Sequence, residues 1–336
     1  MRDNPALRAV PLAVGGRPDQ RGVVATCNYE ARRYGIHSAM ATAQAMKLCP
    51  DLVVIPPAME KYRVASRQIL AIYSDYTDLI EPLSLDEAYL DVSASSHCKG
   101  SATLIAQEIR QRIFSTVGIT ASAGVAPNKF VAKIASDWNK PDGLCLVRPE
   151  EVDAFVAALP VKKLHGVGKV TAAKLNTLGA DTCADLRNWS MQELQHHFGS
   201  FGARLHDLCR GIDAREVSNE RERKSVSTEE TYTPDVPNLP ACLVLLPELF
   251  ESLAGRIQRC GAEKLVNKLF VKIKFANFSQ TTVECVGSAP HLPTFAKLME
   301  TGYLRGKQPV RLLGVGVRLG EPENLEQLSL FADADV

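Results

Sequence analysis

The sequence lacks the features that would place it among zinc-binding, secreted or membrane proteins. No CxxC pair occurs, and no histidine lies at zinc-ligand spacing from a cysteine. The nine cysteines are an odd number, which argues against a disulfide framework. No long apolar run follows a basic patch near Met1, and the longest apolar stretches are far shorter than a bilayer span. We therefore expect a cytoplasmic protein with no membrane association.

The chain also lacks a net charge of one sign, because its formal charge is only +1. The charges are nevertheless unevenly distributed. Residues 251–320 carry 11 Lys or Arg against 4 Asp or Glu, whereas residues 51–100 carry 8 acidic residues against 4 basic ones. A neutral total can thus hide a basic surface for nucleic acid and an acidic metal site. The length of 336 residues suggests roughly two to four domains.

Predicted strands and helices alternate over the first 150 residues. Apolar runs predict strands at residues 10–15, 22–27, 52–55 and 119–125. Helical spacing of apolar residues predicts helices at 38–48, with Ser38 as the N-cap, and at 60–79 and 101–117. This alternation favours an α+β or α/β domain.

The second half of the chain has a different pattern. Residues 151–212 contain short helices, paired glycines and no convincing strand, and residues 213–236 are polar, as in a linker that leads into an edge strand. The order that follows is strand (225–232), helix (238–260), two strands (265–275 and 279–286), helix (292–301) and strand (310–318). This βαββαβ order predicts a ferredoxin-like domain.

The segment SLDEAYLD, residues 84–91, places Asp86 and Glu87 side by side in an apolar stretch. Neighbours on a strand point to opposite faces, so both can serve one site only at a strand end or a turn. Two carboxylates there offer the hard oxygen ligands that Mg²⁺ prefers. Two such ions about 3.5–4 Å apart can activate a 3′-hydroxyl and neutralise pyrophosphate. An isolated Asp-Glu pair is more often a solvated acidic turn, so the context must decide.

Three further segments accompany this one. Residues 28–36 read NYEARRYGI, in which Tyr29 and Arg32 offer a hydroxyl and a planar guanidinium to a phosphate. Residues 122–136 read SAGVAPNKFVAKIAS, and residues 137–143 read DWNKPDG, with Lys140 before a Pro-Asp-Gly turn. Taken alone, the first segment is more often a basic helix start, and a lone lysine before a turn is more often a solvated charge.

In this order, the four segments resemble the motifs of Y-family translesion DNA polymerases of the DNA polymerase IV type. The resemblance covers essentially the whole chain and implies an α+β fold shaped like a right hand. The parts it implies are palm and fingers (1–150), a helical thumb (151–213), a linker (214–224), a little finger with the ferredoxin-like plan (225–320) and a flexible tail (321–336).

The resemblance also implies the chemistry. The family extends primer 3′ ends on damaged templates with two Mg²⁺ ions, and it is error-prone. Asp86 and Glu87 would be the catalytic, metal-binding carboxylates, and Tyr29, Arg32 and Lys140 would bind the incoming deoxynucleoside triphosphate. The expected protein is a monomer whose partners are primer-template DNA, nucleotides and a sliding clamp.

The predicted thumb contains a helix-hairpin-helix pattern, LHGVGKVTAAKL, at residues 164–175. Gly166 and Gly168 let backbone N–H groups approach a DNA phosphate where a helix starts at Lys169. A Gly-x-Gly turn alone is weak evidence, since it marks any tight helix turn. His165 is expected to be a turn residue with no catalytic role.

Lysines of the predicted little finger form a second candidate DNA surface. Lys268, Lys272 and Lys274 have the same parity on one strand, so they are expected on one face of the sheet. A row of lysines on one face suits phosphate contacts. An exposed, solubilising edge is an equally weighted alternative.

The tail ends in QLSLF, which supplies Gln327, Leu328, Leu330 and Phe331. This resembles the peptide by which bacterial polymerases bind the sliding clamp. A polar, acidic tail gains little from displaying large apolar residues unless a partner buries them. A helix end that packs back on the body is the alternative.

The family's first motif, a strand with D-x-D followed by aromatics that exclude ribonucleotides, should precede Met1. Nothing in residues 1–26 replaces it. We expect either a true start upstream, which we prefer because every later motif is intact, or a truncated chain that is catalytically inactive. The strand is central in the family's palm sheet, so its loss would expose unpaired backbone groups.

Two other functional classes fit part of the sequence. A non-catalytic protein that binds DNA and the clamp would keep the thumb, little finger and tail, but it has no need of Asp86, Glu87, Arg32 and Lys140 together. A helix-hairpin-helix nuclease or glycosylase would not explain the SLDEAYLD segment together with the tail.

Overall fold

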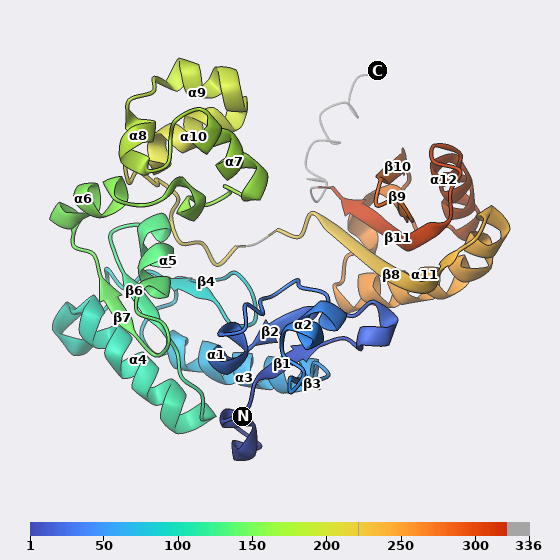
Figure 1. Cartoon of the computed structure of the whole chain (residues 1–336). Helices are drawn as coiled ribbons and strands as arrows, with labels where there is room; N and C mark the ends of the chain where they lie inside the picture. Colours follow the sequence, from blue (N-terminus) through green and yellow to red (C-terminus); the bar gives the residue numbers. More distant parts are fainter. Residues whose placement is uncertain (221, 321–336) are drawn as a thin grey trace, which may run out of the picture. The chain divides into compact units, whose positions relative to one another are not determined.

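The structure is a computed structural model that describes residues 1–220 and 222–320. The chain forms two compact units (Figure 1). The first unit contains residues 3–57 together with the chain from residue 222 onward, and the second unit contains residues 58–221. Among the described residues, every helix is too short or too polar to cross a bilayer.

Residues 3–57 form a small sheet with short helices. The elements are β1 (Leu12–Gly15), β2 (Val24–Cys27), α1 (Tyr29–Arg32), α2 (Thr42–Leu48) and β3 (Val53–Ile55). The strand order is β2-β1-β3, with β1 antiparallel to β2 and parallel to β3. The three predicted strands are confirmed. Ala13 and Val24 of the strands form a buried cluster with Ala45 of α2 and with Ile36 and Leu52 of the connecting segments.

The predicted N-cap of the second helix is wrong. Helix α2 begins at Thr42, and Ser38 precedes it by a full turn. Ala39 has a left-handed φ of 68°, its N–H donates to the Val24 carbonyl, and Val24 N–H donates to the Met40 carbonyl. The segment after Ser38 thus pairs with β2 instead of starting the helix.

Residues 222–320 form a four-stranded antiparallel sheet with two helices. The elements are β8 (Ser225–Val236), α11 (Leu239–Arg259), β9 (Val266–Phe275), β10 (Gln280–Val286), α12 (Leu292–Leu304) and β11 (Val310–Leu319). Both helices pack on the same core as the sheet, with Leu253, Val271, Phe295, Leu313 and Val315 fully buried. The predicted βαββαβ order and the edge position of β8 are confirmed.

The ferredoxin-like prediction is wrong in strand order. A ferredoxin-like sheet has its first and third strands at the centre, whereas the order here is β10-β9-β11-β8, with the second and fourth strands at the centre. Apolar pattern explains the difference. Strand β11 (VRLLGVGVRL) is buried over most of its length and takes a central place, and β8 carries polar residues suited to an edge.

The first half of the second unit mixes helices with short strand pairs. Its elements are α3 (Met59–Ser74), β4 (Ile80–Pro82), β5 (Ala88–Leu90), α4 (Ala102–Val117), β6 (Ala123–Val125), α5 (Lys129–Trp138) and β7 (Leu144–Leu146). Strands β4 and β5 form an antiparallel hairpin, and β6 and β7 form a separate parallel pair. Gly124 on β6 lies so close to α5 that a Cβ would come within 2.1 Å of the Ala132 carbonyl oxygen. The helix can pack on this strand only because residue 124 is glycine.

The second half of this unit is helical, as predicted. Its elements are α6 (Val152–Ala157), the 3₁₀ turn η5 (Val161–Lys163), α7 (Lys169–Thr177), α8 (Cys183–Arg187), α9 (Met191–Phe198) and α10 (Ser200–Leu208). Leu175, Leu186, Leu194 and Leu205 are fully buried among these short helices. The same core includes Phe130 and Val131 of α5, which anchor this helix.

Candidate active site

Asp86 and Glu87 lie in the turn of the β4–β5 hairpin, as their adjacency requires. Leu83 N–H donates to the Glu87 carbonyl at 2.9 Å and closes the turn. The Asp86 carboxylate accepts a hydrogen bond from the Ser84 hydroxyl at 2.6 Å, and Glu87 Oε2 lies 2.9 Å from Lys133 Nζ. Both carboxylates are exposed, so the turn presents two hard oxygen donors to solvent.

Helix α5 carries charged side chains that pair with residues of this hairpin. Lys129, Lys133 and Asp137 are four residues apart and therefore share one helix face. Lys129 pairs with Glu81 on β4, and Lys133 pairs with Glu87 at the turn. Asp137 lies 2.5 Å from Lys140 Nζ. Lys129 and Lys133 had no predicted role, and no helix was predicted here; their four-residue spacing in the segment SAGVAPNKFVAKIAS was the available signal.

The turn that carries Lys140 is held from several sides. Arg110 on α4 donates to the Ala121 carbonyl at 2.8 Å and to the carboxylate of Asp142 at 2.7 Å. A Cβ on Gly143 would lie 1.9 Å from the Asn139 carbonyl oxygen, so only glycine fits the turn. Lys140 therefore lies on a turn that is braced by these contacts, and its side chain is 45% exposed.

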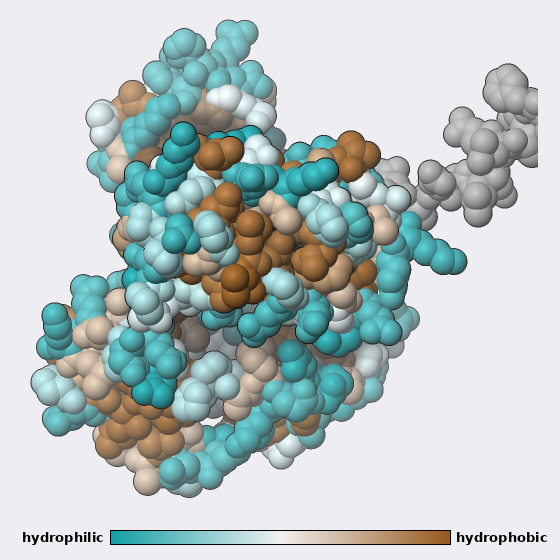
Figure 2. Space-filling model, turned by 90° about the vertical axis from the view of Figure 1, so that its right-hand side faces the viewer, coloured by the Kyte–Doolittle hydropathy of each residue, from teal (hydrophilic) through white to brown (hydrophobic). Residues whose placement is uncertain are grey.

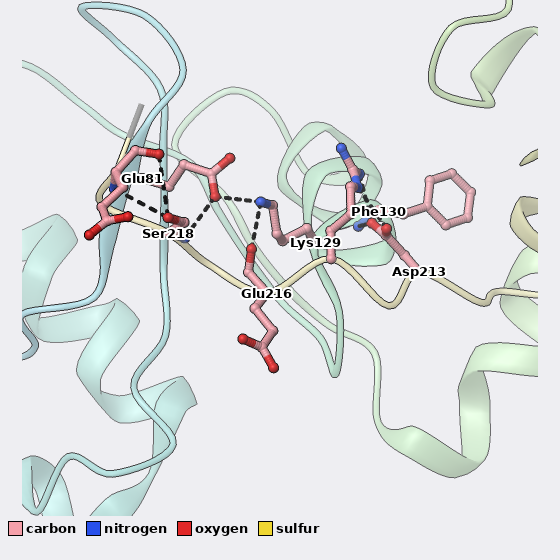
Figure 3. Close-up of polar contacts among 8 residues, drawn as sticks. Glu81, Lys129, Phe130, Asp213, Glu216 and Ser218 are labelled. Atoms are coloured by element: carbon pink, nitrogen blue, oxygen red, sulfur yellow. Dashed lines mark hydrogen bonds and ion pairs between the residues drawn. The ribbon is translucent and has the colours of Figure 1, made fainter. Parts of the chain in front are cut away.

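A buried ion pair ties residues 213–218 to this region (Figure 3). Lys129 donates to the Glu81 carboxylate and, at 2.9 Å, to the Glu216 carbonyl. Glu81 also accepts from Ser218 N–H at 3.0 Å. Burial raises the pKa of Glu81, but the hydrogen bonds from Lys129 and Ser218 outweigh it, so the pKa lies below its ordinary value.

Asp213 forms a second anchor for the same segment (Figure 3). Its carboxylate accepts from Phe130 N–H at 3.0 Å and from Arg215 at 2.7 Å, and the side chain is only 4% exposed. Burial raises the pKa of Asp213, but the Arg215 guanidinium and the backbone N–H groups lower it by more. The pKa of Asp213 therefore lies below its ordinary value. The predicted linker is therefore fixed along the second unit at its first residues.

Tyr29 and Arg32 lie on α1 in the first unit. Asn28 caps this single turn by accepting from Ala31 N–H at 3.0 Å, and it also accepts from Leu12 N–H of β1. The Arg32 guanidinium lies 5.8 Å from the centroid of the Tyr29 ring. Tyr29 and Arg32 are thus brought together, whereas Lys140 belongs to the other unit. Convergence of all three on one triphosphate stays a prediction.

The candidate DNA contacts of residues 164–175 surround the start of α7. Gly166 has a left-handed φ of 89°, and Gly168 is the N-cap of a helix whose first residue is Lys169. No side chain caps that helix. The first backbone N–H groups of α7 can therefore donate hydrogen bonds to an anion.

The three lysines of β9 share one sheet face, as predicted, and they have partners there. Lys268 Nζ lies 2.9 Å from Glu284, and Lys272 Nζ lies 2.9 Å from Glu229. Lys274 Nζ lies 5.1 Å from the centroid of the Phe278 ring. The row is therefore partly neutralised by acidic residues that the strand alone could not reveal.

The face of the molecule in Figure 2 is mainly hydrophilic, with hydrophobic residues gathered in patches. In residues 222–320 the exposed large hydrophobic side chains are those of Val244, Phe278, Val286 and Leu304. The candidate clamp-binding residues Gln327, Leu328, Leu330 and Phe331 lie outside the described residues.

Comparisons with known proteins agree with this geometry. Three family models match successive parts of the sequence: the impB/mucB/samB family over residues 1–137, the DNA polymerase-iota thumb domain over 162–213, and the impB/mucB/samB family C-terminal domain over 223–330. Among solved structures, a Y-family DNA polymerase chimera of Dbh and Dpo4 is similar, with a TM-score of 0.85 and 28% identity, covering 94% of this chain and 93% of that one.

An insertion ternary complex of Dbh DNA polymerase has a TM-score of 0.65 at 27% identity, over 94% of this chain and 93% of that one. The DNA polymerase IV of Ralstonia nicotianae is 63% identical over 334 residues, which cover 99% of this chain and 94% of the relative. The DNA polymerase IV of Pseudomonas putida (strain GB-1) is 59% identical over 332 residues, which cover 98% and 94%. The chain therefore belongs to the DNA polymerase IV group of the Y-family, which are DNA-directed DNA polymerases.

Proposed function

We propose that the chain extends primer 3′ ends past damaged template bases, with Asp86 and Glu87 as the carboxylates of its catalytic site. The observation that carries this proposal is the exposed hairpin turn that presents both side chains together, with Lys133 beside Glu87 at 2.9 Å. DNA polymerases of this group use divalent metal ions. When bound, such ions neutralise the triphosphate and favour attack by the 3′-hydroxyl.

The donor set at the turn fits a divalent cation in kind. Asp86 and Glu87 both present hard carboxylate oxygens, which Mg²⁺ prefers. No group of three or more His, Cys, Asp or Glu side chains that could hold a metal is found in residues 1–220 and 222–320. These two residues would therefore hold Mg²⁺ only together with ligands from elsewhere, such as the triphosphate.

The remaining site residues take their roles from this proposal. Tyr29, Arg32 and Lys140 bind the incoming triphosphate. The thumb contacts DNA through Gly166, Gly168 and Lys169, and the little finger contacts it through Lys268, Lys272 and Lys274. The parts carry the ranges expected from the sequence: palm and fingers to residue 150, thumb 151–213, linker 214–224, little finger 225–320.

The expectation of a missing palm strand and an inactive chain is a hypothesis that the comparisons do not support, since the relatives match 98–99% of this chain. The discriminating experiment compares the chain with a form extended by a D-x-D strand ahead of Met1. Equal primer extension by both forms would overturn the hypothesis.

Primer extension by single variants tests the catalytic assignment. Asp86→Ala and Glu87→Ala, made in whichever form is active, should abolish extension and leave affinity for primer-template DNA nearly unchanged. Leu85→Ala, at an exposed apolar position in the same turn, is the control. Extension at near-normal rates by either carboxylate variant would disprove the assignment.

We also propose that residues 327–331 bind a sliding clamp, a role supported by the Gln-Leu-x-Leu-Phe pattern alone. Purified clamp should bind the full chain but not a Leu330→Ala/Phe331→Ala variant. Unchanged binding by that variant would overturn this role without affecting the catalytic proposal.

A further inference from the structure

A cavity of about 170 Å³ lies in the second unit, next to the catalytic turn. Its lining includes Tyr89 of β5, Lys133 and Asp137 of α5, Lys163 of η5, His165, and Arg215 of the anchored segment. One water needs roughly 10–15 Å³ by a comparable measure, so the cavity has room for a polyatomic ion. Lys133 connects it directly to Glu87.

The charges around this cavity favour an anion. Three cationic side chains line it, against one acidic side chain, Asp137. Three of these four side chains already form an ion pair: Lys133 with Glu87, Arg215 with Asp213, and Asp137 with Lys140.

Of the three cations that line the cavity, Lys163 is the one for which no ion pair is found among the described residues. Burial first, and then the nearby Arg215, Arg204 and Lys133 cations, lower the pKa of His165. The imidazole is therefore a neutral hydrogen-bond donor or acceptor at the cavity wall, in a positive local field.

We propose that this cavity binds a phosphate group. The chemistry that recognises it is charge-assisted hydrogen bonding from Lys133, Lys163 and the free Nη1 of Arg215, since Arg215 Nε and Nη2 already donate to Asp213. The phosphate is that of a DNA backbone or a free phosphate ion.

Chain continuity favours the backbone as the source. Lys163 and His165 lead directly into Gly166 and Gly168, which open a helix N-terminus suited to a further phosphate. A DNA strand presents consecutive phosphates, and the cavity and the helix start would accept phosphates of the same strand. This assignment rests on the proposed polymerase function.

Lys163→Ala and Lys162→Ala form a matched pair for the test. Both lysines are exposed in η5, but only Lys163 lines the cavity. Binding is measured by fluorescence anisotropy on primer-template DNA without nucleotide or metal. Lys163→Ala should weaken binding about tenfold and reduce the salt dependence by about one counterion. Lys162→Ala should change both much less.

A walk of single methylphosphonate linkages along the primer identifies the phosphate. At one position, the neutral linkage should weaken binding of the unmodified protein about tenfold and weaken binding of Lys163→Ala no further. Equal responses of both lysine variants at every position would overturn the DNA source. A titration with inorganic phosphate or pyrophosphate, followed by ³¹P NMR, is the second arm. Binding lost in Lys163→Ala would then assign a free phosphate, and no binding in either arm would overturn the cavity proposal.

This experiment separates the two proposals. Because it measures binding without chemistry, Asp86→Ala protein should show the same methylphosphonate profile as the unmodified protein. If the unmodified protein shows this profile but does not extend primers, the polymerase proposal fails and the cavity proposal stands. Normal extension with a flat profile would do the reverse.

Discussion

Lysine pairs with glutamate in both units of the chain, but in different surroundings. In residues 58–220, Lys129 and Glu81 are 8% and 21% exposed, and they are tied by further hydrogen bonds to Glu216 and Ser218. In residues 222–320, Lys272 and Glu229 are 28% and 34% exposed on an open sheet face. The same residue types therefore serve to fix a chain segment in one unit and to set surface charge in the other.

The difference lies in what each pair loses when it is broken. Removing one partner of a buried pair leaves an uncompensated charge in a poorly solvated place, which costs about 3–5 kcal/mol. An exposed pair contributes about 0.2–1 kcal/mol, because water and salt screen it. Burial and extra hydrogen bonds thus predict stability effects, whereas exposure predicts effects on binding.

The largest expected effect is that of Lys129→Ala. It leaves Glu81 without its cation and removes the hydrogen bond to the Glu216 carbonyl, so the second unit should lose about 3–5 kcal/mol of stability. Both tryptophans, Trp138 and Trp189, belong to this unit. Tryptophan fluorescence during urea unfolding therefore reports on the unit that carries the change.

A double variant, Lys129→Met with Glu81→Leu, is the control. Replacing both charges by apolar groups of similar size should recover much of the loss, because no unpaired charge remains. If Lys129→Ala unfolds at the same urea concentration as the unmodified chain, then the pair is no more than a surface contact and the comparison fails.

The second expected effect is a pH dependence of the stability of the second unit. The pKa values of Glu81 and Asp213 lie below their ordinary values in the folded state. Their contributions to stability are therefore complete above the unfolded-state pKa values of about 4.3 and 3.9, and they are lost as the pH falls through the lower folded-state values. Tryptophan fluorescence melts between pH 6 and pH 3 measure this loss.

Glu81→Gln sharpens this test, because the neutral side chain cannot titrate. The variant should be less stable than the unmodified chain at pH 6, and the difference should shrink toward pH 3. A difference that stays constant over this range would show that Glu81 does not stabilise the unit as a carboxylate.

The third effect concerns the exposed pair of the other unit. Lys272→Ala should change the stability of residues 222–320 by about 0.2–1 kcal/mol. It should weaken DNA binding and reduce the salt dependence by about one counterion, if the lysine contacts a phosphate. Circular dichroism melts and anisotropy titrations measure the two quantities, and Glu229→Gln is the matched control. Lost stability above about 2 kcal/mol would place this pair with Lys129 and Glu81.

Much of this comparison could be anticipated from the sequence, but its decisive part could not. Period two in a strand was enough to place Lys268, Lys272 and Lys274 on one face, because side chains alternate. The adjacency of Asp86 and Glu87 likewise required a turn. Spacing within one element is local information, and helices, strands and turns follow from it.

Pairing between distant elements is what the sequence could not supply. Lys272 on β9 meets Glu229 on β8 across β11, where Gly314 pairs with both residues, so the contact depends on the strand order β9-β11-β8, which the predicted ferredoxin-like order did not give. The partner of Lys129 depends on how α5 packs beside the β4–β5 hairpin. Predicting the partner of Lys272 requires the strand order, and predicting the partner of Lys129 requires the tertiary packing of α5. A local sequence period gives neither.

The smallest expected effect is that of Glu284→Gln. Glu284 lies 2.9 Å from Lys268 and 3.4 Å from Arg318, and hydrogen bonding and charge from Lys268 lower its pKa. Removing this exposed carboxylate leaves two cations on the open face without their acid, and solvent satisfies them at little cost in stability. DNA affinity should therefore rise by about two- to threefold at low salt, and the gain should vanish as salt screens the face. Anisotropy titrations at several salt concentrations measure this, with Glu300→Gln on α12 as a control. Weaker DNA binding by Glu284→Gln would mean that this acid holds Lys268 and Arg318 in the orientation that DNA requires, and the surface pairs would then be positioning contacts like those of the buried pair.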